Sequence, residues 1–382
     1  MTEPCPELLA AADEIASADA LVIGTGAGMG VDSGLGTFRG RNAGVWLPLK
    51  AMQLDFSEMS CPDAFEEDPY TAWAFWKFRH DAYTQSSPHD GYRLLADLGR
   101  RMPKGAFSIT SNIDGHWART AGFGEERTYE MHGALTHMQR VDGTGGPGGI
   151  WPTDPAEIER LPVAPWDLSP GEVVEVLQGG KWMSAPSIKV GEDGATIVSY
   201  DADGIGGPLS NVRGVRRGPS GPDLCRVAAG AQLPVDSSGR AARPNVLMFG
   251  DGTFVDERID EQERRYERWL STLERGTKLA VVEVGAGTAV RTIRSACEGL
   301  VSKHKGPATL VRLNLDQPLV PASPSGGEKR YIGVGGMGAL EAICELDRLV
   351  RERMGGTEVP LPGDGVSTGM VKDTTGRAAL HE

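Results

Sequence analysis

The sequence predicts an α/β protein whose core is a doubly wound, mostly parallel β-sheet. Short apolar runs at 20–23, 279–284 and 309–313 are each followed by glycine or polar residues, as is typical of buried parallel strands. Helical patterns at 6–18 and about 256–275 accompany these runs. Strands that alternate with helices in this way build a Rossmann-like sheet.

The composition excludes several classes of protein. The 382 residues are 40% hydrophobic and 24% charged, which is typical of a globular chain. The net charge of −13, without a basic block, argues against a nucleic-acid partner. We expect no membrane partner, because no run of about 18 apolar residues occurs. The sequence leaves the oligomeric state open.

The five cysteines are scattered and form no C-x-x-C pair. A disulfide framework and a cysteine zinc site are therefore not expected. The first residues lack the basic-then-apolar pattern of a signal peptide. We therefore expect a cytoplasmic protein.

A glycine-rich stretch at 20–40 follows the first apolar run. Glycines at positions 24, 26, 28 and 30 allow close backbone approach and can expose N–H groups to a phosphate, so we expect a nucleotide here. The dinucleotide fingerprint G-x-G-x-x-G fails in this stretch, because Met29, Val31 and Ser33 stand where its last glycine is needed. A tight strand-to-helix turn without a ligand is the alternative.

Further along the first half, a cluster of aromatic residues at 62–85 indicates a helical core. A strand at 105–110 is followed by Ser111, Asn112, Ile113 and Asp114, and polar residues after a strand are where open α/β sheets place their sites. A second short strand, at 127–135, ends near His132. Asn112 or Asp114 could instead cap a helix, and a lone histidine is often structural.

From about 139 to 242 helical periodicity disappears, and short runs at 172–177, 187–190 and 195–200 predict a β-rich insertion. The α/β pattern resumes with an expected strand at 244–251. The segment 333–338 does satisfy G-x-G-x-x-G, but no full strand is predicted before it, so it is at most a cover for a nucleotide held elsewhere. We expect the tail at 355–382 to be disordered.

Taken together, these segments resemble the sirtuins, a family of NAD-dependent protein deacylases. Six blocks occur in the family's order, namely GAGMGVDSGLGTFRG at 26–40, SNID at 111–114, HG at 132–133, RPNVLMFGD at 243–251, GAGTAV at 285–290 and LVRLN at 310–314. The resemblance covers about 1–138 and 243–354. It implies a sirtuin-like NAD-binding domain with a helical segment at about 41–90, and an insertion at 139–242 in place of the family's zinc ribbon.

The resemblance also implies an activity and roles for particular residues. The protein would remove acyl groups from lysine in a protein substrate, consuming NAD and releasing nicotinamide and O-acyl-ADP-ribose. His132 would be the general base on a ribose hydroxyl, Asn112 would position water and ribose hydroxyls, and Asp114 would hold the nicotinamide amide. The NAD-binding set would be Gly26, Ala27, Gly28, Phe38, Arg39, Ser111, Asn112, Ile113, Asp114, Gly285, Ala286, Gly287 and Asn314. The backbone amides of the two glycine loops would hold the pyrophosphate, Asn314 would lie on the adenine-side ribose, and Phe249 and Gly250 would contact the substrate.

Some positions depart from the family pattern. The family's zinc-binding C-x-x-C pairs are missing, and 236–239 reads DSSG where the second pair would fall, so no zinc is expected. Thr37 replaces the family's acid before Phe38. Trp76 and Arg79 stand where some sirtuins that prefer acidic acyl chains carry Tyr-x-x-Arg. A guanidinium suits a carboxylate, so the pair could select such an acyl chain; a surface arginine is the alternative.

Two other functions use the same pocket. One is NAD hydrolysis or ADP-ribosyl transfer, since loss of the zinc module could leave the peptide groove poorly formed. The other is a non-catalytic scaffold that binds NAD and a partner, which the presence of Asn112 and His132 disfavours.

Overall fold

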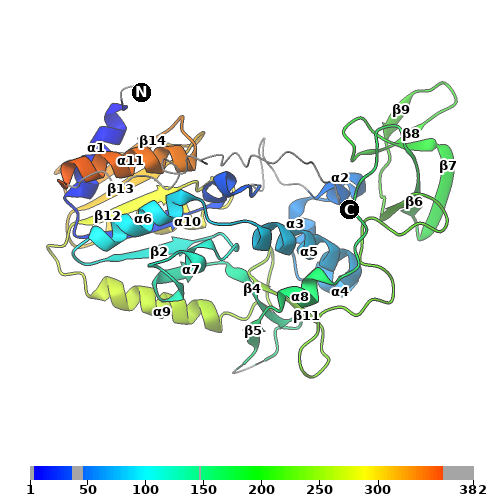
Figure 1. Cartoon of the computed structure of the whole chain (residues 1–382), viewed down its shortest axis with the longest axis horizontal. Coiled ribbons are helices and arrows are strands. Elements are labelled where there is room, and N and C mark those ends of the chain that lie inside the picture. The colour runs from blue at the N-terminus through cyan, green and yellow to red at the C-terminus, as the bar shows by residue number, and fades with distance from the viewer. Residues whose placement is uncertain (1–3, 37–45, 146–147, 356–382) are drawn as a thin grey trace, which may run out of the picture.

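A six-stranded parallel sheet forms the core of the computed structural model, which describes residues 4–36, 46–145 and 148–355 (Figure 1). Every pair of neighbouring strands is parallel, in the order β14-β13-β12-β1-β2-β3. The strands are β1 (Ala20–Thr25), β2 (Ala106–Thr110), β3 (Thr128–Glu130), β12 (Leu279–Val284), β13 (Ala308–Leu313) and β14 (Lys329–Val334). The predicted fold class is confirmed.

Helices cover both faces of this sheet because its strands are apolar on both sides. In β1, Leu21 and Ile23 pack into a core with one set of helices, whereas Ala20 and Val22 pack into the opposite core. The first set is α1 (Pro6–Ala16), α6 (Asp90–Arg101) and α11 (Ala339–Arg353), and the second is α9 (Glu257–Ser271) and α10 (Thr292–Lys303). Figure 1 shows α11 and α9 on opposite sides of the sheet.

Short elements follow β1 and β2 at the carboxyl edge of the sheet. A 3₁₀ segment, η1 (Ala27–Ser33), follows β1 directly. α7 (His116–Arg119) follows β2, whereas η2 (Glu125–Arg127) leads into β3 at the opposite, amino edge. The predicted glycine turn after the first strand therefore leads into a tight helical turn rather than a long helix.

The described part of the segment predicted to be helical holds four helices, which are α2 (Leu47–Met52), α3 (Phe56–Met59), α4 (Asp63–Glu67) and α5 (Pro69–Gln85). Its aromatic side chains, with Trp73, Phe75 and Trp76 nearly inaccessible to solvent, form a third hydrophobic core. That core also takes in side chains of the β-rich insertion, such as Val176 and Ile188. The insertion and the helical segment are therefore packed together and share one core.

Two small antiparallel sheets occupy the region between the halves. The three-stranded sheet is β11-β4-β5, made of β4 (Gly133–Arg140), β5 (Ile150–Pro152) and β11 (Ala242–Val246). The five-stranded sheet is β10-β6-β7-β8-β9, made of β6 (Val173–Gln178), β7 (Lys181–Val190), β8 (Ile197–Tyr200), β9 (Gly206–Pro208) and β10 (Gly214–Arg216). A short helix, α8 (Pro155–Glu159), precedes the larger sheet.

Three sequence-based assignments of strands are corrected. The run expected at 244–251 is β11, which pairs antiparallel with β4 and does not join the parallel sheet. The strand expected at 127–135 is split into β3 and β4, because the chain turns at Gly133, whose φ is +71°. A full edge strand, β14, precedes the segment 333–338; its charged residues Lys329 and Arg330 hid it from an apolar-run criterion.

Candidate functional site

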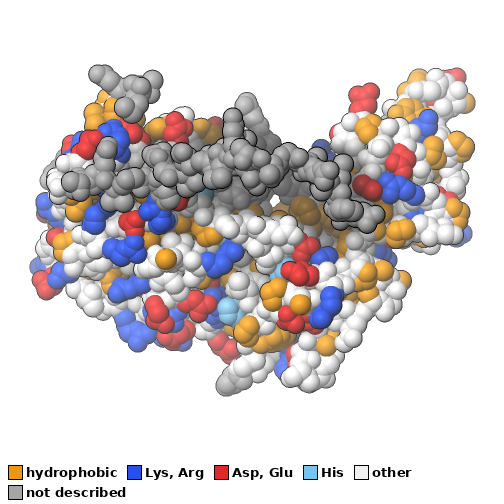
Figure 2. Space-filling view, in the orientation of Figure 1, with side chains coloured by type: hydrophobic (Ala, Val, Ile, Leu, Met, Phe, Trp, Pro, Cys, Tyr) orange, Lys and Arg blue, Asp and Glu red, His pale blue; other side chains and the backbone are white. Residues whose placement is uncertain are grey.

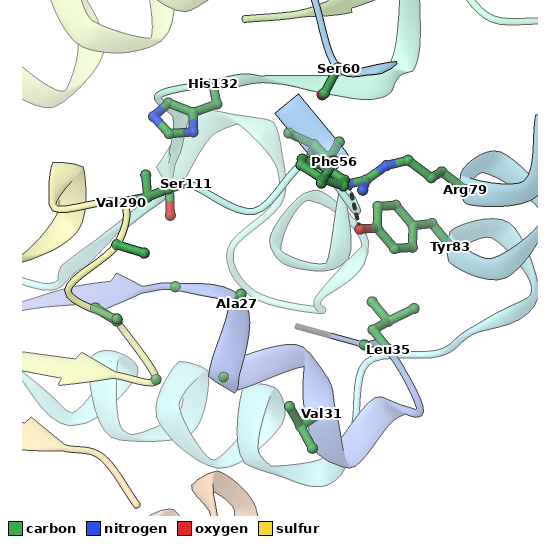
Figure 3. Close-up of a pocket in the computed structure, with 18 of the residues that line it drawn as sticks. Ala27, Val31, Leu35, Phe56, Ser60, Arg79, Tyr83, Ser111, His132 and Val290 are labelled. Atoms are coloured by element: carbon green, nitrogen blue, oxygen red, sulfur yellow. Dashed lines mark hydrogen bonds between the residues drawn. The ribbon is translucent and has the colours of Figure 1, made fainter. Parts of the chain in front are cut away.

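A cavity of about 1670 Å³ opens at the carboxyl edge of the parallel sheet. One end is lined by the loops that follow β1, β12 and β13, and the other by helices α2 and α5. Figure 3 shows His132, Ser111 and Val290 on one side of it, and Phe56, Arg79 and Tyr83 on the opposite side. Of the predicted site residues, those lining it are Gly26, Ala27, Gly28, Trp76, Arg79, Ser111, Ile113, His132, Phe249, Gly285, Ala286, Gly287 and Asn314.

The two glycine-rich loops interlock backbone to backbone. A Cβ on Gly285 would lie 2.4 Å from the Met29 amide nitrogen, and one on Gly26 would lie 2.6 Å from the Cα of Ala286. Gly285 also has a φ of +65°, a conformation that favours glycine. The glycines are therefore required for the loops to touch.

Three backbone amides that were predicted to hold a pyrophosphate bind protein carbonyls instead, and one of these bonds crosses the contact between the loops. The N–H of Gly28 donates to the Gly285 carbonyl (2.9 Å), that of Gly26 donates to Val284 (3.0 Å), and that of Gly285 donates to Leu313 (3.0 Å). The structure thus corrects the role of these three amides, which bind protein carbonyls. Within the described residues, the amides of Ala27, Ala286 and Gly287 have no protein acceptor and remain for a ligand. These three amides and the contact between the loops fit a phosphate-bearing cofactor.

Asn314 lines the cavity at the end of β13, but its side chain is committed to the loops. Its amide nitrogen donates to the Ala286 carbonyl (2.9 Å), and its oxygen accepts from the Gln317 backbone (2.9 Å). Its predicted position on a ribose stays a prediction. What the structure adds is that Asn314 supports the loop bearing two of the open amides.

Asn112 and Asp114 do not line the cavity in the described structure, contrary to their predicted roles. The Asn112 amide nitrogen donates to the Gly26 carbonyl (3.0 Å). Asp114 is 9% exposed and accepts from the His116 backbone (2.8 Å). Burial raises the pKa of Asp114 to about 6. From behind the cavity wall, Asn112 supports the first glycine loop, whereas Asp114 supports the start of α7.

His132 lies at the turn between β3 and β4 and is half-buried. Its Nε2 lies 3.1 Å from the Thr292 hydroxyl, at the start of α10. Burial lowers the pKa of His132, so the imidazole is neutral at pH 7 and can accept a proton. His132 is thus a base in the wall of the cavity.

Arg79 is buried at the far end of the cavity, which rejects the alternative of a surface arginine. Its guanidinium donates to the Tyr83 hydroxyl (2.7 Å) and lies 4.9 Å from the centre of the Phe56 ring and 5.4 Å from that of Trp76. Trp76 itself is 1% exposed and forms part of the wall. The hydroxyl beside the arginine therefore comes from Tyr83, one helical turn further on, and not from position 76.

Two further predicted residues differ in position. Phe249 is 49% exposed at the cavity rim, and its amide donates to the Ser60 carbonyl (2.9 Å). Gly250 does not line the cavity, because the turn at φ +65° carries it away from the rim. Phe38 and Arg39 lie outside the described residues.

Sequence reasoning missed Tyr83, Phe56 and Thr292. The signal for Tyr83 was its place four residues after Arg79 on a helix, which puts both side chains on one face.

The segment 333–338 was expected at most to cover a nucleotide, and its Met337 and Gly338 do line the cavity.

Comparison with known proteins finds a family match for part of the chain. The family model described as Sir2 family matches residues 26–145, which contain the first glycine loop and His132. This segment of the chain belongs to the Sir2 family. The resemblance stated from the sequence is therefore confirmed for residues 26–145.

Curated relatives match about a third of the chain. An NAD-dependent protein deacylase of Deinococcus radiodurans is 33% identical over 143 residues, which are 37% of this chain and 54% of that protein. The mitochondrial NAD-dependent protein deacylase sirtuin-5 of Danio rerio is 33% identical over 138 residues, 35% of this chain and 42% of that protein. The chain spans about half the length of the curated relatives it matches.

Solved structures extend the likeness to the whole fold. A crystal structure of a Sir2 homologue in complex with NAD has a TM-score of 0.52 at 19% identity, covering 92% of this chain and 96% of that one. A mutant Sir2 homologue in complex with 2′-O-acetyl-ADP-ribose has a TM-score of 0.53 at 20% identity, covering 92% and 98%. These similarities show that the chain shares the fold of those structures.

Buried and half-buried titratable groups in and around the cavity predict that acid destabilises the protein. Burial lowers the pKa of His116 to about 3 and that of His137 to about 4, and it also lowers those of His89 and His132. An unfolded histidine takes up its proton near pH 6.5, so the unfolded state binds more protons as the pH falls below that value. Asp114 acts in the opposite sense, because its raised pKa gives a contribution that is present at low pH and lost as the pH rises through about 6.

The contribution of the four histidines to the pH dependence of stability should outweigh that of Asp114. We therefore expect the free energy of unfolding to fall between pH 7 and pH 5. Urea unfolding at a series of pH values measures it. Asp114→Asn should make the decline steeper, because it removes the opposing term. A free energy that rises on acidification would contradict this prediction.

Proposed function

We propose that this chain is an NAD-dependent protein lysine deacylase, which releases nicotinamide and O-acyl-ADP-ribose. The observation that carries the proposal is that one cavity is lined by open backbone amides at one end, by a neutral histidine, and by a buried arginine at the other end. The names of the curated relatives, NAD-dependent protein deacylases, support it.

The residues of the cavity can divide the work as follows. NAD supplies a ribose carbon whose bond to nicotinamide breaks as the acyl oxygen of the substrate attacks it. The amides of Ala27, Ala286 and Gly287 would bind the pyrophosphate, which aligns the ribose with His132. His132, neutral because of its burial, would accept the proton of a ribose hydroxyl. The apolar walls between His132 and Arg79 would hold the acyl-lysine and exclude water.

Arg79 would make the enzyme prefer an acyl chain that ends in a carboxylate. The aromatic rings around its guanidinium exclude water, so that a carboxylate reaching it would gain a strong charge-assisted bond. The hydroxyl of Tyr83 already holds the guanidinium and could contact the same group.

The test compares NAD products by mass spectrometry with acetyl-lysine and succinyl-lysine peptides. We expect O-acyl-ADP-ribose with both peptides and faster turnover of the succinylated one. Arg79→Met should lower kcat/KM for the succinyl peptide at least about tenfold while changing that for the acetyl peptide less. Nicotinamide released equally without any peptide would show NAD hydrolysis instead, and absence of turnover would leave only a binding scaffold.

We also propose that the small sheet after His132 is held without zinc. In the turn at 236–240, the carboxylate of Asp236 accepts from the backbone amides of Ser238 (2.8 Å) and Arg240 (2.9 Å) and from the Arg140 side chain. These bonds tie β4 to the turn before β11, a role that a metal could otherwise fill. No cluster of metal-binding side chains occurs among the described residues. Elemental analysis of the purified protein should find less than one zinc per chain.

Location and partners remain proposals as well. A cytoplasmic protein is supported by five cysteines that are all free in the structure. No helix among the described residues has the length and apolarity needed to cross a bilayer. On the face shown in Figure 2, acidic and basic side chains are mixed over α6 and α9, which favours a protein substrate over nucleic acid. Cell fractionation and nucleic-acid binding assays test these two points.

A further inference from the structure

The Thr292 hydroxyl is a hydrogen-bond partner of His132 for which the function proposed above assigns no role. It lies 3.1 Å from Nε2 of the imidazole and comes from a different element, the first turn of α10. Both side chains are half-buried, and both line the cavity. The contact links His132 to the loop that carries the open amides of Ala286 and Gly287.

The Thr292 side chain does not cap its helix. The residue before it, Arg291, occupies the N-cap position, and no side chain caps that end. The Ser295 amide is satisfied by the Arg291 carbonyl. In the described part of the chain, the Thr292 hydroxyl therefore has His132 as its side-chain partner.

A hydroxyl at this place decides the state of the imidazole. A neutral imidazole carries one N–H donor and one lone pair, and the bond that one nitrogen makes determines which nitrogen holds the proton. A threonine hydroxyl can accept from Nε2–H or donate to the Nε2 lone pair, but in either case it holds the ring in one orientation. For a base, orientation and tautomer decide whether the lone pair faces its substrate.

Charged groups on the surrounding elements do not determine the orientation or the tautomer of the His132 imidazole. Glu130, on the strand before His132, is paired with Arg258 of α9. Asp114 is bonded to the His116 backbone, and Arg291 is exposed to solvent. Arg294 of α10 donates to the carbonyls of the loops. Burial is the cause of the lowered pKa of His132.

We propose that Thr292 is a positioning residue, whose hydroxyl orients the His132 imidazole and determines which of its nitrogens carries the proton. This inference rests on the proposed function for its effect on catalysis, but the contact itself exists without a substrate.

The test therefore begins with the NAD-free protein. Nitrogen-15 NMR of histidine-labelled protein follows the titration of His132, whose signals are identified among the seven histidines by their loss in His132→Gln. In Thr292→Val, which keeps the shape but lacks the hydroxyl, we expect the apparent pKa to move by about half a pH unit or more. A downward shift means that the hydroxyl accepts from His132, and an upward shift means that it donates; both support the proposal. Thr292→Ser should restore the wild-type titration.

Catalysis supplies the second measurement. Thr292→Val should lower kcat about three- to tenfold and displace the acidic limb of its pH profile, with KM for NAD little changed, and Thr292→Ser should recover most of kcat. Should the valine variant fold poorly, Thr292→Ala replaces it in both measurements. An unchanged His132 titration and tautomer in a folded variant would overturn the proposal. A wild-type protein without deacylase activity would instead overturn the proposed function, while the NMR titration would still test the role of Thr292.

Discussion

His132→Ala is expected to eliminate NAD-dependent removal of acyl groups while leaving NAD binding nearly intact. The imidazole is the neutral base in the cavity wall, and loss of a general base typically costs 10²- to 10⁴-fold in rate. NAD binding should persist, because the open amides lie on the two glycine loops and not on the turn that carries His132. Peptide turnover by mass spectrometry and NAD affinity by calorimetry measure the two effects.

A matched control lies on the neighbouring strand. His137, five residues later on β4, is also half-buried but does not line the cavity. His137→Gln should retain deacylation within a few-fold. Deacylation at the wild-type rate in His132→Ala would remove the histidine from the proposed chemistry.

Gly285→Ala is expected to destabilise the fold and to abolish NAD binding at micromolar concentrations. Its Cβ would lie 2.4 Å from the Met29 amide nitrogen and 2.6 Å from the Cα of Gly28, both backbone atoms that cannot move away independently. The left-handed conformation of Gly285 adds about 1–2 kcal/mol for any residue with a Cβ. Forcing the loops apart should therefore lower the free energy of unfolding by more than about 2 kcal/mol.

Thermal and urea unfolding measure the loss of stability, and calorimetry measures NAD binding. Gly287→Ala is the control for stability, because a Cβ at that position in the same loop would meet nothing within 4 Å. Gly250→Ala separates the two causes, since Gly250 has a φ of +65° but open space around it. If Gly285→Ala is as stable as Gly287→Ala, the interlocked loops do not determine stability.

Much of the fold was predictable because it rests on short-range patterns. Apolar runs bounded by glycine identified β1, β12 and β13, since strands buried on both faces of a parallel sheet are apolar throughout. The edge strand β14 escaped this criterion, because an edge position tolerates Lys329 and Arg330. β11 was assigned to the wrong sheet, because an apolar run does not specify its partner.

The sequence by itself determined the Sir2-family motifs of residues 26–145, a parallel sheet, a glycine loop after its first strand, and His132 near the end of another strand. Motif letters and their order are sufficient for that. Only the tertiary structure decided which groups face the cavity. The Gly28 amide bonds to Gly285 across two loops almost 260 residues apart, and those of Gly26 and Gly285 bond to the ends of strands β12 and β13. The amides of Ala27, Ala286 and Gly287 are left open.

The same distinction holds for the side chains. Asn112 and Asp114 match their motif but lie behind the cavity wall, whereas Tyr83 and Thr292 belong to no recognised motif and lie in the wall. The physical reason is that a hydrogen bond or a stacked ring depends on the relative placement of separate elements. Helix α5 brings Tyr83 to Arg79 by local periodicity, but only the packing of α10 against the turn after β3 brings Thr292 to His132.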